Sequence, residues 1–240
     1  MIRSKFRGGA SPLGELGAPV VDFADVERLR PDLIVVASFP TLIPAGTIAA
    51  ANVGSLNVHM SLLPRHRGVD PIFWTYWDDD RAAGVTVHWM DSRLDSGDIA
   101  AQESLAFERG FASRDLYMQL AHLGVELLSG VLKDVSSGCA LRQPQGEAGA
   151  TYESAADISG ARIPAAQWPA ERVWHVVRGL GDQRSGLLAE HEGKFLPHGR
   201  AIRYRVTDDT HPGRVAIVNE GYEVHCQDGI VTVERLGHAK

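Results

Sequence analysis

The fold is decided by the stretch Asp32-Leu-Ile-Val-Val-Ala-Ser38, a continuous apolar run that is rich in β-branched residues. Such a run is typical of a strand that is buried on both faces of a sheet. Two further strand candidates follow it, Gly54 to His59 and Gly84 to Met90. Because stretches that suit helices or turns separate these runs, the pattern predicts an α/β domain with a mostly parallel sheet.

Working outward, Ala18-Pro-Val-Val-Asp-Phe23 reads as a short strand. Ser113 is a suitable N-cap for a helix that ends near Val135, because leucines and valines recur there at three- and four-residue steps. A second, shorter helix is predicted from Pro169 to Leu180.

The stretch from Gln143 to Gly149 is polar and rich in turn formers, which favours a linker. After it the pattern changes to four short strands between turns, at residues 200–207, 213–219, 222–226 and 229–236. We therefore expect a catalytic domain over residues 1–148 and a small β-rich, barrel-like domain over residues 149–240.

Composition narrows the class of protein. The chain has 240 residues and a formal net charge of −6, which does not favour a nucleic-acid partner. Its two cysteines, Cys139 and Cys226, are far apart and match no metal spacing, so we expect reduced thiols, no metal and a cytoplasmic protein. No apolar run approaches the roughly 20 residues that a membrane-spanning helix needs, so no membrane partner is expected.

Three polar residues stand where a sheet of this kind places ligands. Asn57 and His59 are two apart on a predicted strand, so their side chains point to the same face, near the strand's C-terminal end. Asp95 follows the next long strand in a loop with Ser96 and Gly97, and neighbouring strands would bring it to His59.

These groups suit the attack of an amine on a formyl carbon. An asparagine amide stabilises the oxyanion that develops, while a histidine donates to that oxygen or takes the amine proton. A nearby aspartate favours a charged imidazole and selects its tautomer, or accepts the proton through water. On the residues alone, a packed histidine and a turn-forming aspartate stay open as alternatives.

The motifs Asn57-Val-His59, Ser61-Leu-Leu-Pro64 and Leu94-Asp-Ser-Gly97 together resemble the 10-formyltetrahydrofolate-dependent formyltransferases. This family includes the methionyl-tRNA and glycinamide ribonucleotide enzymes. The resemblance implies a Rossmann-like formyltransferase domain, with Asn57, His59 and Asp95 as its catalytic residues. It also implies 10-formyltetrahydrofolate as the formyl donor and no metal.

The resemblance further implies two sets of binding residues. The folate pocket corresponds to Phe39, Leu42, Ile43, His88, Met90, Asp91, Ser92 and Arg93. The acceptor site corresponds to Arg67, Asp70, Phe73 and Trp74. For the apolar members of both sets, simple packing is the alternative. The stretch from Gly68 to Trp77 is more similar to formylation domains that act at the start of nonribosomal peptide synthesis than to the tRNA enzymes.

The chain departs from the family at its start, where we find no counterpart of the family's first strand, helix and second strand. We therefore expect a shortened catalytic domain whose sheet exposes apolar surface unless a partner, such as a second copy in a homo-oligomer, covers it. The leading function is transfer of formyl to a small or carrier-bound amine or amino acid in specialised metabolism. The alternatives are methionyl-tRNA formylation, hydrolysis of the formyl donor, and a non-catalytic folate-binding or scaffold role.

Overall fold

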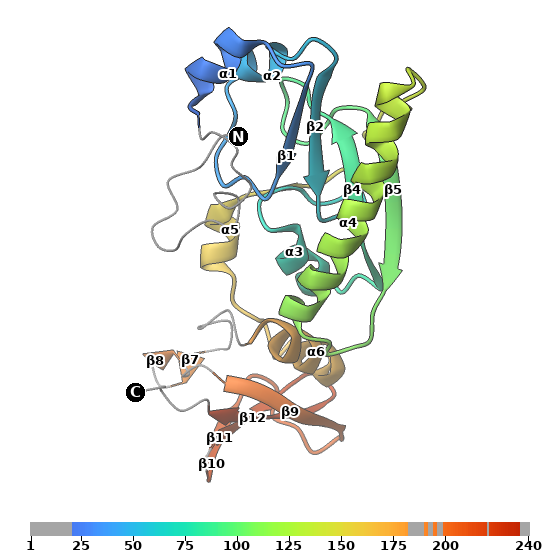
Figure 1. Ribbon diagram of the computed structural model, residues 1–240. Helices are drawn as coiled ribbons and strands as arrows, with labels where there is room; N and C mark the ends of the chain where they lie inside the picture. Colours follow the sequence, from blue (N-terminus) through green and yellow to red (C-terminus); the bar gives the residue numbers. More distant parts are fainter. Residues whose placement is uncertain (1–20, 182–189, 192–193, 196–198, 220, 236–240) are drawn as a thin grey trace. The chain divides into compact units, whose positions relative to one another are not determined.

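The computed structural model describes residues 21–181, 190–191, 194–195, 199–219 and 221–235. These residues form two compact units that interleave along the chain. The first unit contains residues 21–68, 84–103 and 122–152, and the second contains residues 69–83, 104–121 and the described part after 152. The α/β fold class with a separate β-rich sheet is confirmed (Figure 1). A single domain boundary after residue 148 stays a prediction.

The first unit is built on a four-stranded sheet in the order β1-β2-β4-β5. Its strands are β1 (Leu33–Ala37), β2 (Gly54–His59), β4 (Ala82–Trp89) and β5 (Ile99–Ala106). The runs that predicted β1, β2 and β4 are therefore strands. Strand β5 has no sequence signal, because most of its side chains are polar or small and face solvent.

The sheet is mixed in direction. Strands β1 and β2 run parallel, as expected, with Val36 opposite Asn57, whereas β4 runs antiparallel to β2. The connection from β2 to β4 carries one short helix, α3 (Pro71–Trp77), of seven residues.

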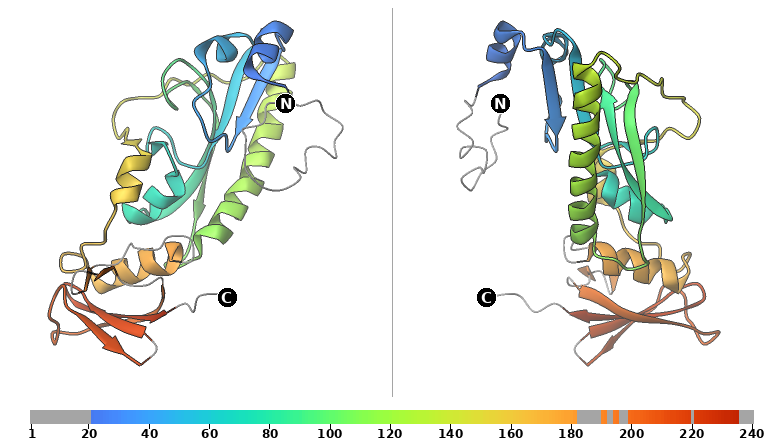
Figure 2. Two further views of the ribbon diagram at one scale, coloured as in Figure 1. Left: turned by 90° about the vertical axis from the view of Figure 1, so that its left-hand side faces the viewer. Right: turned by 45° about the vertical axis from the view of Figure 1, so that its right-hand side comes forward.

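The core of the first unit lies between this sheet and helix α4 (Ser113–Ser136), which crosses one face of the sheet (Figure 2). The predicted leucine and valine stripe supplies the helix side of this core through Leu123, Leu127 and Val131. Gly124 allows the helix to approach closely, because a Cβ there would lie 3.0 Å from Val58 Cγ1. The helix predicted from Ser113 is thus confirmed.

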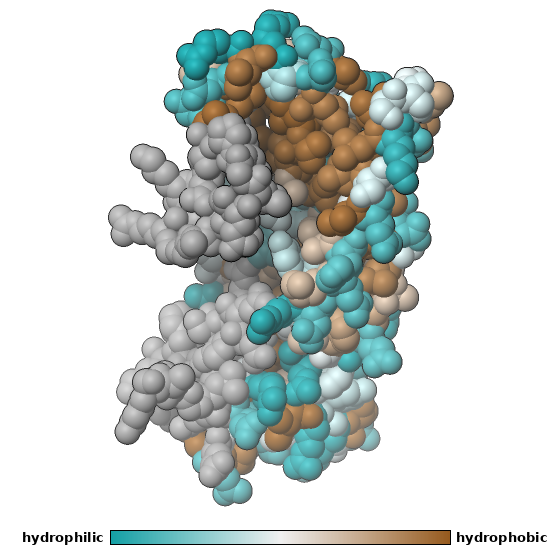
Figure 3. All heavy atoms as spheres, in the orientation of Figure 1, coloured by the Kyte–Doolittle hydropathy of each residue, from teal (hydrophilic) through white to brown (hydrophobic). Residues whose placement is uncertain are grey.

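Strand β1 is less buried than its apolar sequence predicts. We expected a strand covered on both faces, but Val35 is 43% exposed and only Val36 is buried. Strand β1 stands first in the strand order of the described sheet, so one side of it has no neighbouring strand there. In the view of Figure 3, apolar residues gather over β1 and β2, beside α4. A homo-oligomer that covers this surface stays a prediction.

Two helices beside the sheet were not expected, α1 (Phe23–Leu29) and α2 (Ala45–Ala49). The predicted strand from Ala18 to Phe23 is wrong at Phe23, and residues 18–20 lie outside the described part of the chain. Asp22 starts helix α1 instead, because its side chain accepts from Asp25 N while the Asp25 carboxylate accepts from Asp22 N. This reciprocal capping outweighs the β-propensity of the preceding valines.

The second unit carries an antiparallel sheet in the order β10-β11-β12-β9, packed against helix α6 (Ala170–Leu180). Its strands are β9 (Gly199–Val206), β10 (Val215–Val218), β11 (Gly221–His225) and β12 (Gly229–Arg235). All four were predicted, as was α6. The remaining described elements are α5 (Ala155–Gly160) and the short strands β3 (Arg67–Gly68), β6 (Tyr152–Glu153), β7 (Glu190–His191) and β8 (Lys194–Phe195). None of the described helices is both long and apolar enough to cross a membrane.

Candidate active site

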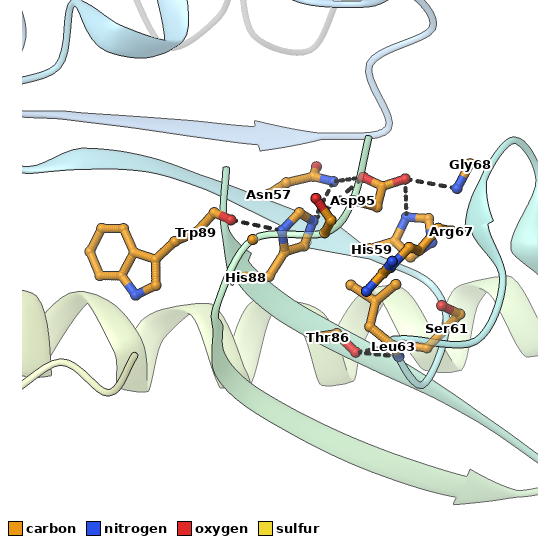
Figure 4. A network of polar contacts seen from close by, with 12 residues as sticks. Asn57, His59, Ser61, Leu63, Arg67, Gly68, Thr86, His88, Trp89 and Asp95 are labelled. Atoms are coloured by element: carbon orange, nitrogen blue, oxygen red, sulfur yellow. Dashed lines mark hydrogen bonds and ion pairs between the residues drawn. The ribbon is translucent and has the colours of Figure 1, made fainter. Parts of the chain in front are cut away.

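Strand β2 presents two of the predicted site residues on one face. Asn57 and His59 alternate with the core residue Val58, as the period of a strand requires. In the register of β2 with β4, His88 stands opposite Asn57. The polar residues of the two strands therefore meet at one place in the sheet (Figure 4).

The loop after β4 brings Asp95 to the same place. Asp95 adopts a left-handed conformation with φ of 48°, which aspartate tolerates better than most residues. Gly97 follows it where a Cβ would lie 1.9 Å from the Trp89 carbonyl oxygen, so only glycine lets the loop pack this closely on β4.

Asp95 is the centre of the site, as Figure 4 shows. Its Oδ2 accepts a hydrogen bond from the Gly68 N–H at 2.8 Å and lies 3.8 Å from His59 Nδ1. Its Oδ1 accepts from Asn57 Nδ2 at 3.3 Å. The predicted meeting of Asn57, His59 and Asp95 is confirmed, while their catalytic roles stay proposals.

His59 is held as a neutral imidazole. Burial lowers the pKa of His59, and this effect exceeds the opposing influence of the Asp95 charge. Its Nε2–H donates to the His66 carbonyl at 2.8 Å, which leaves the Nδ1 lone pair facing Asp95. Asp95 favours the charged imidazole, as expected, but desolvation outweighs its effect. The expectation that Asp95 selects the tautomer is wrong, because the His66 carbonyl does so.

Asp95 is held as a carboxylate. Burial by itself would raise the pKa of Asp95, but hydrogen bonding with His88, the charge that His59 carries when it is protonated and the Gly68 N–H together lower it below the ordinary aspartate value. The site thus sets two proton acceptors, a neutral imidazole nitrogen and a carboxylate oxygen, 3.8 Å apart. A proton that arrives at either one is stabilised by the other.

His88 orders the amide of Asn57. Its Nδ1–H donates to the Trp89 carbonyl at 3.0 Å, and its Nε2 lies 3.2 Å from Asn57 Nδ2 and 3.5 Å from Asp95 Oδ1. The amide nitrogen of Asn57 therefore lies within hydrogen-bonding distance of both His88 and Asp95. A substrate oxygen that binds Asn57 must replace one of these two contacts. Of the predicted folate contacts, His88 is placed beside Asn57 and Asp95.

The other predicted folate residues lie in two loops. Leu42 is 78% exposed, Ile43 is partly buried, and Phe39 packs edge-on against Phe23 at 5.9 Å. In the loop after β4, Met90 N donates to the Ser55 carbonyl and Arg93 N donates to the Asp91 carboxylate. The backbone of this loop is thus well ordered, Ser92 is exposed, and the assignment of these residues to folate stays a prediction.

The predicted acceptor residues serve structural contacts. Asp70 caps helix α3 by accepting from Phe73 N at 3.2 Å. Phe73 is 1% exposed and packs against Trp74 and Trp77. Arg67 has no exposed surface, so it is not a solvated loop residue. Their role in acceptor binding stays a prediction.

Several residues of the site were not found from the sequence. Gln145 belongs to the stretch that we read as a linker, but its amide donates to the carbonyls of Asp95 and Gly97. That stretch is not a free linker, because Gln143 also pairs with Ile99 beside β5. His66 contributes through its backbone oxygen alone. A backbone contact, and a contact between residues 50 positions apart, leave no pattern in a single sequence.

The arrangement suits one kind of chemistry. An amide donor and a pair of proton acceptors stand together in a largely buried place, which favours attack of a neutral amine on an acyl carbon. The amide can stabilise a developing oxyanion while the acceptors take the proton that the amine loses.

Comparisons with known proteins agree with this chemistry. The formyl transferase family model matches residues 22–132. The chain is 31% identical to the methionyl-tRNA formyltransferase of Caldanaerobacter subterraneus subsp. tengcongensis, over 90% of this chain and 70% of that protein. An N-formyltransferase from Helicobacter canadensis, solved with folinic acid and dTDP-3-aminofucose, is similar in fold, with a TM-score of 0.70, 18% identity and coverage of 90% and 78% of the two chains. A sugar 3N-formyl transferase solved with dTDP and 5-N-formyl-THF is also similar, with a TM-score of 0.71, 16% identity and coverage of 94% and 81%.

Proposed function

The chain belongs to the formyl transferase family, and from that premise we propose that it transfers a formyl group from 10-formyltetrahydrofolate to the amino group of a small or carrier-bound amine. The observation that carries this proposal is the position of the Asp95 carboxylate, which accepts from Asn57 and lies 3.8 Å from the free nitrogen of a neutral His59.

The donor supplies the formyl carbon, bonded to N10 of the folate. In the overall reaction a bond forms between the amine nitrogen and this carbon, and the bond from the carbon to N10 breaks. One proton leaves the amine nitrogen and one proton is gained by N10, so the products are a formamide and tetrahydrofolate. No oxidant or reductant is needed.

His59 and Asp95 manage the proton in this scheme. As the amine nitrogen bonds to carbon it becomes acidic, and its proton passes to His59 Nδ1 or to Asp95 directly or through one water. The resulting imidazolium is paired with the carboxylate and is further stabilised by its hydrogen bond to the His66 carbonyl. The same proton is then available for N10 as the leaving group departs.

Asn57 stabilises the charge that develops on the formyl oxygen. One of its amide hydrogens turns from its present acceptor to this oxygen, and the other keeps the amide in place. We assign the contact with Asp95 Oδ1, at 3.3 Å, as the one that the formyl oxygen replaces, because this exchange frees the carboxylate to accept a proton.

The loops beside the site fit a folate donor in the chemistry of their side chains. Leu42, after β1, and Leu94, after β4, are 78% and 43% exposed. We assign Phe39, Leu42, Ile43 and the loop from His88 to Arg93 to the donor on the family resemblance.

The acceptor is the finer part of the proposal. The net charge of −6 supports a small or carrier-bound amine over a large polyanion. The solved formyl transferases with a similar fold include one crystallised with the nucleotide-linked amino sugar dTDP-3-aminofucose, and a sugar 3N-formyl transferase crystallised with dTDP. We therefore include amino sugars, together with amino acids, among the small amines to be tested.

Methionyl-tRNA is the second candidate, and one observation favours it. Strand β9 exposes Arg203 and Arg205, which are two apart and so share one face of the strand. A pair of exposed arginines on one face suits contact with a phosphate backbone. The curated relative named above is also a methionyl-tRNA formyltransferase.

One assay separates these functions. The protein is incubated with 10-formyltetrahydrofolate and either no amine, amino acids, nucleotide-linked amino sugars or methionyl-tRNA, and both tetrahydrofolate and formylated product are followed. Tetrahydrofolate without an amine identifies the hydrolase. Formylation of methionyl-tRNA alone, lost when Arg203 and Arg205 are both changed to Glu, overturns the small-amine proposal in favour of the second candidate.

The site itself is tested by Asp95→Ala in the same assay. We expect kcat to fall by at least about a hundredfold, the usual scale for a positioned proton-transfer group. The variant should stay folded, because Asp95 lies in a loop, and circular dichroism serves as the control. Near-normal turnover in this variant would refute the assignment, and no transfer by the wild-type protein to any acceptor would favour the scaffold alternative.

A further inference from the structure

The Asp95 loop is held from outside by one side chain, Gln145. Its Nε2 donates to the carbonyl oxygens of Asp95, at 3.0 Å, and Gly97, at 2.6 Å. Gln145 comes from a segment 50 residues further along the chain, in the same compact unit. One hydrogen bond thus holds the backbone of Asp95 itself, and the other holds the backbone two residues further along the loop.

The orientation of this amide is set by Arg67. The guanidinium donates to Gln145 Oε1 through Nε at 3.2 Å and through Nη2 at 2.9 Å. Because an arginine can only donate, the amide oxygen must face Arg67 and the amide nitrogen must face the loop. A glutamine with its amide turned round would place two donors against each other.

Arg67 is itself immobilised. It has no exposed surface, and its Nη1 donates to the Tyr152 hydroxyl and to Glu147, 3.3 Å away. A buried charge without partners would be strongly unfavourable, so these contacts and those to Gln145 act together. Next to Arg67 in the chain, the Gly68 N–H donates to Asp95 Oδ2. The segment around Arg67 thus contacts Asp95 twice, directly and through Gln145.

The loop needs such support. Asp95 has φ of 48°, a conformation that is less stable than the usual ones for a residue with a side chain. Asp95 must also stay within reach of His59, and a displacement of about 1 Å is enough to lower a rate about a hundredfold.

We propose that Gln145 is a positioning residue for formyl transfer: its amide, oriented by Arg67, holds the Asp95 carboxylate in register with Asn57 and His59. The expected fall in kcat rests on the proposed function, whereas the expected displacement of Asp95 does not. Gln145 itself touches only the backbone of the loop, so it acts through Asp95.

Three variants test it. Gln145→Ala removes both donors and the acceptor. Gln145→Glu keeps the acceptor for Arg67, and so keeps the buried charge paired, but lacks the N–H donors to the loop. Gln143→Ala is the matched control, because Gln143 is exposed and its backbone pairing with Ile99 does not depend on its side chain.

In the formyl-transfer assay, kcat should fall at least about tenfold in both Gln145 variants and change less than about twofold in the control. Gln145→Glu should unfold at a lower temperature than the wild type, because it sets a carboxylate oxygen against two carbonyl oxygens, so kcat is measured well below that temperature to separate positioning from stability. The acid limb of kcat/KM, which reports protonation of His59, should move to lower pH in Gln145→Ala, because a displaced Asp95 no longer raises the pKa of His59. The titratable side chains facing Asp95 in the described structure, His59 on β2 and His88 on β4, are unchanged in these variants.

A second measurement is independent of activity. The Asp95 charge raises the pKa of His59 against the effect of burial, so a displaced Asp95 should let the pKa of His59 fall further. NMR titration of the imidazole signals, with His59 assigned through His59→Gln, should show this fall in Gln145→Ala and not in Gln143→Ala. An unchanged His59 titration, or wild-type kcat in Gln145→Glu, overturns the inference. Absence of transfer by the wild-type protein overturns only the proposed function, since the titration still reads the position of Asp95.

Discussion

Acidification from pH 7 to pH 4 should destabilise the second unit through one buried residue, His175. This side chain lies on α6 with no exposed surface, stacks on Tyr76 with ring centroids 4.9 Å apart, and accepts the Gly110 N–H at its Nδ1. Burial, and after it the charge of Arg109, lower the pKa of His175 to about 4, while Asp79 opposes the change.

The direction of the effect follows from proton linkage. The pKa of His175 in the unfolded chain is 6.5 and in the folded protein about 4, so between these values the unfolded chain binds more protons. The free energy of unfolding is therefore unaffected above about pH 7 and falls as the pH drops through this window. The difference of about 2.5 between the two pKa values corresponds to about 3 kcal/mol, complete near pH 4, with about 2 kcal/mol already lost at pH 5.

Urea unfolding, followed by tryptophan fluorescence between pH 7 and pH 4, measures this loss. Because carboxylates also titrate in this range, the informative quantity is the difference between wild type and His175→Gln. The variant should be less stable at pH 7 by about 1–2 kcal/mol, since it loses the stacking on Tyr76. It should then lose about 3 kcal/mol less than wild type on acidification.

His122→Gln is the control, because His122 is exposed on α4 and the chemical change is the same. Its pH dependence should follow that of the wild type. If His175→Gln and the wild type lose the same free energy of unfolding between pH 7 and pH 4, the buried, neutral state assigned to His175 is wrong.

Two further predictions concern the active site and its loop. The pH–rate profile of formyl transfer should be flat near pH 7 and fall on an acid limb whose apparent pKa lies below 6.5, because protonation of His59 removes a proton acceptor; a limb above that value would contradict the assignment. Gly97→Ala should destabilise the protein by at least about 2 kcal/mol and abolish most activity, since its Cβ would lie 1.9 Å from the Trp89 carbonyl oxygen. The control Gly130→Ala, where no atom lies within 4 Å of the added Cβ on α4, should stabilise the protein by about 0.5–1 kcal/mol. Urea unfolding measures both, and equal stabilities would exclude the tight contact at Gly97.

Local patterns in the sequence were sufficient for the main elements. The leucine and valine steps after Ser113 define α4, and the apolar runs define β1, β2 and β4, because helix and strand periods are properties of neighbouring residues. The spacing of Asn57 and His59 placed both on one face, since alternation along a strand does not depend on the rest of the fold.

The same patterns gave wrong predictions wherever contacts between segments distant in the sequence determine the structure. The apolar run of β1 predicted burial on both faces, yet Val35 is exposed because β1 has one described neighbour. The parallel arrangement stops at β2, since β4 runs antiparallel to it, and an apolar run does not encode the direction in which its strand pairs. Polar β5 was missed because its pairing, not its composition, makes it a strand.

The sequence by itself determined which side chains could carry the chemistry, through the Asn57-x-His59 pair and the loop that contains Asp95. Only the tertiary structure decided the states in which they act. Burial makes His59 neutral against the pull of Asp95, the His66 carbonyl selects its tautomer, and Gln145 reaches the Asp95 loop from a stretch that reads as a linker. The physical reason is that desolvation and long-range hydrogen bonds depend on packing among distant segments, whereas residue type and spacing are local.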